Sequence, residues 1–150
     1  MGKIDLFIGP CVLESKELGF EIAEFLKEKI EPISKNLNIS FKASFDKANR
    51  SSIDSYRGPG IDEGLKNLAA IKKEFGFPLI TDFHLPTQAV AVSEVVDTLQ
   101  VPAFLCRQTD MLIAAGQAAQ KNNCRVKVKK GQFLSPEETV NIVNLSLIHI

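Results

Sequence analysis

Residues 79–101 read LITDFHLPTQAVAVSEVVDTLQV, and this stretch contains the structural unit that repeats along the chain. Leu79–Asp82 and Thr98–Val101 are short runs typical of buried strands, and Thr87–Val96 between them has the length of a helix. A strand, a helix and another strand in succession predict two parallel strands joined by a crossover helix.

The same alternation continues on both sides of this stretch, with no linker or low-complexity tract. The further strands that it predicts are Leu6–Gly9, Ile39–Ser44 and Arg125–Lys129, and the further helices are Ile61–Phe75, Gln108–Asn122 and Pro136–Asn144. The first helix is marked by apolar residues that recur from Leu18 to Leu37 behind a capping Ser15, and Pro32 is expected to interrupt it. Five βα units fit either an open doubly wound sheet or part of a (β/α)8 barrel.

The composition is that of a globular domain. Of the 150 residues 45% are hydrophobic, and 18 Lys plus Arg balance 18 Asp plus Glu. A net charge of zero gives no general attraction to nucleic acid or to an acidic membrane surface, so neither is expected as a partner. No segment resembles a secretory signal or a membrane span, which predicts a cytoplasmic protein. The three cysteines lack a CxxC pair and are expected to be reduced.

One face of each predicted strand is polar, which is unusual for a buried parallel sheet. Side chains alternate in direction along a strand, so the residues that share this face are Phe7, Gly9 and Cys11; Ser40, Lys42 and Ser44; Ile80, Asp82 and His84; Thr98 and Gln100; and Lys127 and Lys129. We expect the ionisable groups to gather at the carboxyl ends of the strands, where barrel enzymes carry their catalytic groups. Lys42 would then pair with an anionic ligand. A structural ion pair of Lys42 and Lys129 with Asp82 or another acidic residue is the alternative.

The segment Asp46–Gly60 is polar and too long for an ordinary connection between two elements. It places Lys47, Asn49 and Arg50 close to Lys42 in the sequence. A functional loop is therefore predicted rather than a merely solvated one.

Five segments together resemble the 3-deoxy-D-manno-octulosonate 8-phosphate synthases, also called 2-dehydro-3-deoxyphosphooctonate aldolases. They are GPCVLES at 9–15, FKASFDKANRSS at 41–52, TDFH at 81–84, PAFLCRQTD at 102–110 and KKGQF at 129–133. The resemblance implies an α/β fold, a (β/α)8 TIM barrel of which this chain would supply about five of eight units. Residues 1–144 would be the N-terminal part of that single domain. Residues 145–150 break the helical pattern and would be a non-native tail.

The resemblance implies a transferase that condenses phosphoenolpyruvate with D-arabinose 5-phosphate and water. The products would be 3-deoxy-D-manno-octulosonate 8-phosphate, a lipopolysaccharide precursor, and phosphate. The residues implied by the match are Lys42, Lys47 and Lys129 for phosphoenolpyruvate; Asn49, Arg50 and Ser51 for arabinose 5-phosphate; and Gln100, His84 and Arg107 for the lining and the adjacent loop. Fixed cations suit this chemistry because both substrates are anions and phosphate departs. Intact members are homotetramers, in which Arg50 would serve a site shared with a neighbouring subunit.

Cys11 separates two subclasses of this family, because the metal-independent members carry Asn there. Cysteine implies the metal-dependent class, with Cys11 as a ligand of a divalent metal of unknown identity. The site would be incomplete in this chain, since later strands would carry the remaining ligands. Taken alone, Cys11 would be read as a small buried hydrophobe. For His84 a satisfied core histidine is the alternative.

Two departures from the family pattern and two competing functions remain. The connection from Asp110 to Lys129 is longer than expected, and Lys127 stands where Asn is usual. A barrel of about five units lacks the rest of its active site, so the 150-residue chain by itself is expected to be inactive. The competing functions are a 3-deoxy-D-arabino-heptulosonate 7-phosphate synthase, against which the KANRSS block argues, and a noncatalytic phosphosugar-binding half barrel.

Overall fold

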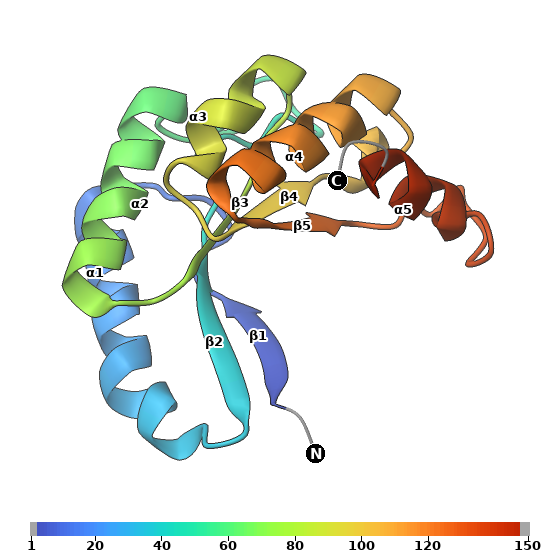
Figure 1. Cartoon of the computed structure of the whole chain (residues 1–150). Helices are drawn as coiled ribbons and strands as arrows, with labels where there is room; N and C mark the ends of the chain where they lie inside the picture. Colours follow the sequence, from blue (N-terminus) through green and yellow to red (C-terminus); the bar gives the residue numbers. More distant parts are fainter. Residues whose placement is uncertain (1–2, 148–150) are drawn as a thin grey trace. The chain divides into compact units, whose positions relative to one another are not determined.

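The computed structural model describes residues 3–147 and divides into two compact units, Met1–Ile80 and Thr81–Ile150. Figure 1 shows strands alternating with helices in both units. The strands are β1 (Ile4–Ile8), β2 (Leu37–Lys42), β3 (Leu79–Asp82), β4 (Thr98–Val101) and β5 (Arg125–Val128). The chain passes from one unit to the other within β3.

The order of the strands decides between the two architectures that the sequence left open. Within residues 3–147 the order is β1-β2-β3-β4-β5, and β1 with β2, β2 with β3, and β4 with β5 pair in parallel. A doubly wound sheet reverses its direction of winding, so a later strand would lie beside β1. Strictly sequential neighbours are those of a (β/α) barrel, and the prediction of an incomplete barrel is confirmed.

Regular helices connect the strands close to the predicted positions. They are α1 (Lys16–Phe25), α2 (Ile61–Phe75), α3 (Ala89–Ser93), α4 (Thr109–Asn122) and α5 (Thr139–Leu147). The predicted bounds of α2, β3 and β4 agree with the structure. The prediction of one helix over Thr87–Val96 is wrong in detail, because a 3-10 turn at Pro86–Gln88 precedes a short α3.

Local backbone signals explain where α2 begins and ends. Gly60 precedes it with a φ of 87°, and Gly76 follows it in the left-handed conformation, donating its amide to the carbonyl of Lys72 at 2.9 Å. Acidic residues lie in its first turn and basic residues in its last turn, which complements the helix dipole. Glycine at such positions avoids the strain that a side chain would impose.

The first helix ends earlier than its apolar pattern predicted. Ser15 caps α1 as expected, accepting the amide of Leu18 at 3.1 Å. After Phe25 the chain continues as a π-helical turn and then a 3-10 turn, Glu31–Ile33, that contains Pro32. Proline has no backbone N–H to donate to a helical hydrogen bond, so the helical part of the chain ends with this 3-10 turn at Ile33. Leu37 therefore begins β2 instead of ending the helix, and it pairs with Ile4.

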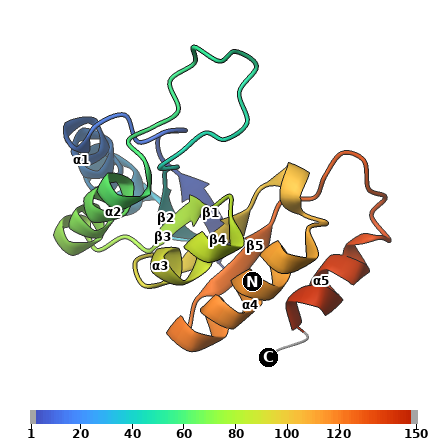
Figure 2. The same cartoon turned by 90° about the horizontal axis from the view of Figure 1, so that it is seen from above.

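In the first unit, α1 and α2 lie side by side (Figures 1 and 2). The face of β2 predicted to be apolar is fully buried, with Phe41 and Ala43 at 0% exposure. On the polar face Ser40 is 3% exposed and Ser44 0%, while Lys42 between them is half-buried. Polar side chains buried in this way need hydrogen-bond partners, which makes this face a candidate site.

In the second unit, α3 and α4 cover β4, and α5 packs against α4. Leu99, Val101 and Leu112 form the core between them, each 0% exposed. Cys106 is also fully buried, and the thiol of Cys124 donates to the carbonyls of Ser93 and Val96 at 3.2 and 3.1 Å. Both cysteines therefore contribute to the packing of the second unit.

The last helix starts and ends later than predicted. Ser135 and Glu138 exchange hydrogen bonds, the amide of Ser135 donating to Glu138 at 2.8 Å and the amide of Glu138 to Ser135 at 3.4 Å. Residues 136–138 form a turn in which the amide of Thr139 donates to the carbonyl of Pro136, and α5 begins at Thr139. The helix continues through Leu147, so the predicted break at Leu145 is wrong. Ile148–Ile150, with His149, lie outside the described residues.

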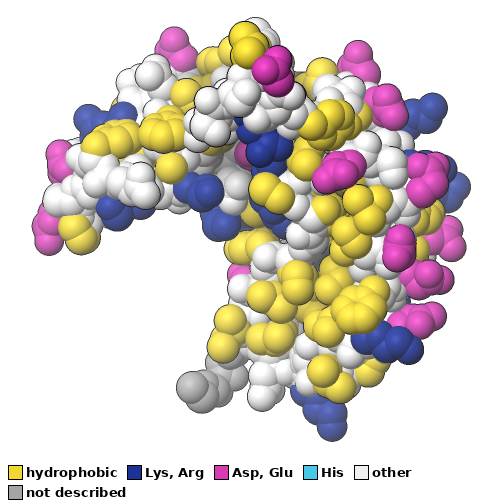
Figure 3. Space-filling model, turned by 180° about the vertical axis from the view of Figure 1, so that it is seen from behind, with side chains coloured by type: hydrophobic (Ala, Val, Ile, Leu, Met, Phe, Trp, Pro, Cys, Tyr) yellow, Lys and Arg dark blue, Asp and Glu magenta, His cyan; other side chains and the backbone are white. Residues whose placement is uncertain are grey.

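Apolar side chains also reach the surface (Figure 3). In the first unit Ile33 and Ile53 are 78% and 99% exposed, and in the second Phe104 and Phe133 are 62% and 59% exposed. Within residues 3–147, β1 and β5 each have one strand neighbour. Such edges and apolar surfaces favour association. No helix among these residues is long and apolar enough to cross a membrane.

Candidate functional site

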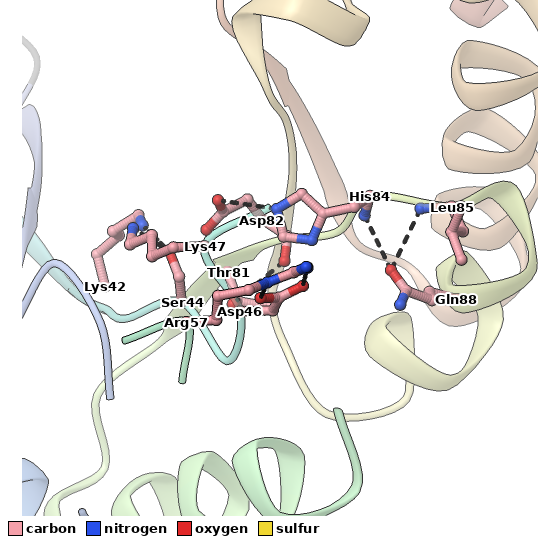
Figure 4. Close-up of polar contacts among 10 residues, drawn as sticks. All are labelled: Lys42, Ser44, Asp46, Lys47, Arg57, Thr81, Asp82, His84, Leu85 and Gln88. Atoms are coloured by element: carbon pink, nitrogen blue, oxygen red, sulfur yellow. Dashed lines mark hydrogen bonds and ion pairs between the residues drawn. The ribbon is translucent and has the colours of Figure 1, made fainter. Parts of the chain in front are cut away.

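Two lysines of the first unit converge on a single hydroxyl oxygen. Lys42, the last residue of β2, donates from its Nζ to Ser44 Oγ at 2.8 Å, and Lys47 donates to the same oxygen at 2.7 Å (Figure 4). Lys42 and Lys47 are half-buried, and Ser44 is fully buried. A hydroxyl can accept two hydrogen bonds, so one neutral side chain orients two positive charges toward each other. We call these three residues the lysine cluster.

The lysine cluster is tied to the segment after β1. Val12 forms a bridge with Ser44, and the amide of Leu13 donates to the Ser44 carbonyl at 2.9 Å. Gly9 makes this approach possible, because a side chain there would collide with the carbonyl oxygen of Lys42. Cys11 directly precedes Val12 and is exposed. The interpretation of Cys11 as a buried hydrophobe is therefore wrong.

The loop from residue 46 to residue 60 is irregular but closed at its base, as Figure 2 shows for the turquoise segment between β2 and α2. The amide of Lys47 donates to the carbonyl of Arg57 at 2.6 Å, and the amide of Gly60 donates to that of Phe45 at 3.1 Å. The Arg57 guanidinium forms two hydrogen bonds to the Asp46 carboxylate, at 2.8 and 2.5 Å. These contacts hold the two ends of the loop together.

The residues predicted to bind arabinose 5-phosphate lie in this loop and are exposed. Arg50 donates from Nε and Nη2 to the carbonyl of Tyr56 at 3.1 and 2.8 Å, which fixes the direction of its guanidinium. The hydroxyl of Tyr56 in turn donates to the carbonyl of Glu14 at 3.2 Å. Asn49 and Ser51 flank Arg50 and are also exposed. Their substrate roles stay predictions.

In the second unit, polar groups follow β3. The Nε2 of His84 lies 3.5 Å from a carboxylate oxygen of Asp82, and their side chains are 11% and 12% exposed. Gln88 holds the backbone beside them, since its Oε1 accepts the amides of His84 and Leu85 at 2.9 and 3.2 Å (Figure 4). The contact with Asp82 suits a satisfied core histidine as well as a catalytic one. A catalytic role for His84 therefore stays a prediction.

The ends of β4 and β5 carry the remaining predicted residues of the second unit. Gln100, 4% exposed, accepts a hydrogen bond from Lys127 Nζ at 3.0 Å. Burial lowers the pKa of Lys127, and the positive charge of Lys129 lowers it further. The charge of Lys129 is thus close enough to act on Lys127, and the expectation that both side chains share one face stays a prediction. Arg107 follows a 3-10 turn, Ala103–Leu105, and is exposed.

A cavity of about 300 Å³ lies elsewhere in the second unit. Its lining is mainly apolar and comprises Val126, Val128, Lys130, Thr139, Ile142 and Val143. Val126 and Val128 alternate with Lys127 along β5, so this cavity faces away from the predicted site residues. A packing gap between β5 and α5 explains it better than a substrate site.

Several residues that organise these groups were not predicted as site residues. Ser44 was placed on the polar face of its strand, but its role as a shared acceptor depends on a side-chain geometry that alternation does not specify. Three further residues hold parts of the backbone in place. Arg57 binds Asp46 at the base of the loop, and Gln88 binds the amide of His84. Only Gln88 had a recognisable signal, its place three residues after Leu85 at the start of a helical turn.

A divalent metal needs several ligating side chains close together. Within residues 3–147 no group of three or more His, Cys, Asp or Glu side chains gathers in a way that could hold an ion. Cys11 offers one thiol in the first unit. Transition-metal sites need three or four such ligands. The described residues therefore form no complete metal site, and the role of Cys11 as a metal ligand stays a prediction.

Comparisons with known proteins agree with the motifs. A sequence model described as the DAHP synthetase I family matches residues 2–148. Proteins named 2-dehydro-3-deoxyphosphooctonate aldolase from Campylobacter jejuni and Fusobacterium nucleatum are 56% and 54% identical, each over 92% of this chain. One of the same name from Desulfatibacillum aliphaticivorans is 53% identical over 87% of it. The chain spans 49%, 48% and 46% of these relatives, about half of their length.

Proposed function

Because the chain belongs to the DAHP synthetase I family, we propose that it forms part of a synthase that condenses phosphoenolpyruvate with D-arabinose 5-phosphate and water. The products are 3-deoxy-D-manno-octulosonate 8-phosphate and inorganic phosphate. The relatives named for the eight-carbon product support this acceptor over the seven-carbon alternative. We place the protein in the cytoplasm, in lipopolysaccharide precursor synthesis.

The observation that carries this proposal is the lysine cluster. Phosphoenolpyruvate carries a phosphate and a carboxylate, and two ammonium groups directed at one oxygen provide adjacent positive charges for such a ligand. Mutual repulsion between the two ammonium groups is relieved when an anion lies between them. Lys42 and Lys47 would thus hold the phosphate or carboxylate, while Lys129 would supply a further cation in the second unit.

In this reaction the lysine ammonium groups would act by electrostatic stabilisation. When C3 of phosphoenolpyruvate attacks the aldehyde carbon of arabinose 5-phosphate, C2 becomes electron-poor and accepts water. Phosphate then leaves from the resulting carbon, and fixed ammonium groups stabilise the charge on the departing oxygen. The same groups keep C3 oriented toward the aldehyde, which lowers the entropic part of the barrier. Asn49, Arg50 and Ser51 would orient the second phosphosugar.

Three further assignments belong to the same proposal. The intact synthase is a homotetramer in which Arg50 reaches a site shared with a neighbouring subunit. Cys11 is one ligand of a divalent metal whose other ligands lie outside this chain. The 150-residue chain by itself binds phosphoenolpyruvate but does not turn it over, because about five of eight barrel units supply only part of the active site.

A titration tests the binding step. The chain is labelled with 15N-lysine, and phosphoenolpyruvate is added while the lysine amide and amine signals are followed by NMR. Saturable shifts of Lys42 and Lys47 are expected, and the Lys42→Met variant should lose about tenfold in affinity, as expected for one charge-assisted hydrogen bond. Lys66→Met, on the exposed side of α2, is the control. Absence of saturable shifts in the lysine cluster would contradict the proposal.

The choice of acceptor needs a synthase with a complete barrel carrying these residues. Phosphate release is measured with arabinose 5-phosphate and with erythrose 4-phosphate, each with and without a chelator. Preference for erythrose 4-phosphate would favour the heptulosonate synthase. Activity unaffected by the chelator would remove the metal from the proposal, and binding without turnover of either acceptor would favour the noncatalytic module.

A further inference from the structure

The loop from residue 46 to residue 60 carries cationic residues that the proposed function places against both substrates. Irregular loops of this length have no repeating hydrogen-bond pattern to fix their side chains. Ser44 binds the ammonium group of Lys47, but the backbone of Lys47 and the side chain of Arg50 need other contacts to hold them in place. In the first unit, the returning part of the loop, Tyr56–Gly58, meets both residues.

Two consecutive carbonyl groups of this returning segment bind the backbone of Lys47 and the guanidinium of Arg50. The carbonyl of Arg57 accepts the backbone amide of Lys47 at 2.6 Å. The preceding carbonyl, that of Tyr56, accepts two hydrogen bonds from the Arg50 guanidinium at 3.1 and 2.8 Å. A shift of this segment would therefore move Lys47 and Arg50 together.

The returning segment is itself held by three contacts, two at the base of the loop and one with the segment before α1. The guanidinium of Arg57 donates one hydrogen bond to each carboxylate oxygen of Asp46, a paired arrangement that we call the fork. The hydroxyl of Tyr56 donates to the carbonyl of Glu14 at 3.2 Å. Gly58, with a φ of 126°, passes so close to Phe45 that any side chain would collide with the Phe45 carbonyl. Of these contacts, only the fork joins two charged side chains.

We infer that Arg57 is a positioning residue, whose paired hydrogen bonds to Asp46 set the returning segment and through it the orientation of Lys47 and Arg50. This inference rests on the proposed function only for the ligand that the two cations meet. Asp46 directly precedes Lys47, so the hydrogen bonds between Arg57 and Asp46 fix the backbone next to Lys47. Lysine in place of Arg57 would keep the charge but lose the planar fork.

Because Arg57 and Asp46 are partly exposed, a positioning role of their ion pair can be distinguished from a contribution to the stability of the whole fold. The side chain of Arg57 is 59% exposed and that of Asp46 21%. Exposed ion pairs add little to the free energy of folding, because water and salt compete for them. Loss of the fork should therefore leave global unfolding nearly unchanged. It should loosen only the returning segment and the two cationic residues attached to it.

The test compares the wild-type chain with Arg57→Lys, Asp46→Asn and the double variant. Two quantities are measured: hydrogen exchange of the Lys47 amide, and the dissociation constant of phosphoenolpyruvate from the NMR titration. We expect faster exchange of the Lys47 amide, about fivefold to tenfold weaker binding, and an unchanged urea midpoint. The double variant should match the single ones, because either change removes the same fork. Arg125→Lys, an exposed arginine of the second unit, is the matched control.

The outcomes distinguish this inference from the proposed function. If the wild type shows no saturable binding, the proposed function fails, and the Lys47 amide still reports whether Arg57 positions the loop. If the wild type binds and Arg57→Lys binds equally well with unchanged exchange at Lys47, the positioning role is overturned. A general rise in exchange over α2 and β2 with a lower urea midpoint would mean that Arg57 is merely structural, which also overturns it.

Discussion

The ammonium group of Lys127 on β5 donates a hydrogen bond to the side-chain oxygen of Gln100, 3.0 Å away on β4. The register of the two strands places these residues opposite each other. Gln100 is 4% exposed, so its oxygen lies where water does not compete. Strand pairing thus brings a charged amine against a buried neutral acceptor.

The lowered pKa of Lys127 predicts a pH-dependent contribution to stability. Burial and then the charge of Lys129 lower this pKa below 10.5, so the unfolded chain holds the proton more tightly than the folded one. The cost of burying the charge is fully present below the folded pKa and is relieved as the pH rises through it toward 10.5. In urea unfolding, the wild type should gain stability relative to Lys127→Met over that range. Parallel pH profiles would contradict this explanation.

Ser44→Ala should weaken anion binding without unfolding the first unit. The change removes the shared acceptor that directs Lys42 and Lys47 toward each other. Binding of phosphoenolpyruvate is expected to weaken about fivefold to tenfold, the effect of about one hydrogen bond. Ser40→Ala removes another buried hydroxyl from the same face of β2 and should leave the affinity unchanged. Equal effects of both variants in the titration would mean that Ser44 matters only for packing.

Gly64→Ala should destabilise the protein, although alanine is the better helix former by about 1 kcal/mol. A methyl group at this position of α2 would collide with Cβ of the buried Phe45, which cannot move without its backbone. We expect a loss of about 1–3 kcal/mol in the free energy of unfolding, measured in urea. Gly19→Ala in α1 is the control, since its methyl group would meet only the movable ends of Leu13 and Ile71, at 2.8 and 2.9 Å. A cost for Gly19→Ala as large as that for Gly64→Ala would refute the argument.

Gln88→Ala should loosen the turn that presents His84. The side-chain oxygen of Gln88 accepts the amides of His84 and Leu85, which otherwise lack a helical acceptor at this helix start. We expect a loss of about 0.5–2 kcal/mol, typical of a removed cap, and faster hydrogen exchange at these two amides. Gln117→Ala on the exposed face of α4 should change neither quantity. Unchanged exchange at His84 would show that the turn holds without Gln88.

Sequence patterns predicted the elements whose structure depends on residues close to one another along the chain. The bounds of α2, β3 and β4 agree because strand alternation, helical periodicity and terminal glycines act over a few residues. The pattern failed at Leu37, whose apolar side chain suits a helix and a strand equally well. There the turn around Pro32 and pairing with β1 made the choice, and neither is visible in the local periodicity.

The same distinction between sequence and tertiary structure holds for the candidate site. By itself, the sequence determined which cationic residues follow the strands and which family they belong to, because both depend on residue identity and order along the chain. Only the tertiary structure decided that Lys42 and Lys47 share one oxygen and that the carbonyls of Tyr56 and Arg57 hold Arg50 and Lys47. The physical reason is that these hydrogen bonds depend on the path of an irregular loop, whose dihedral angles follow no repeating pattern.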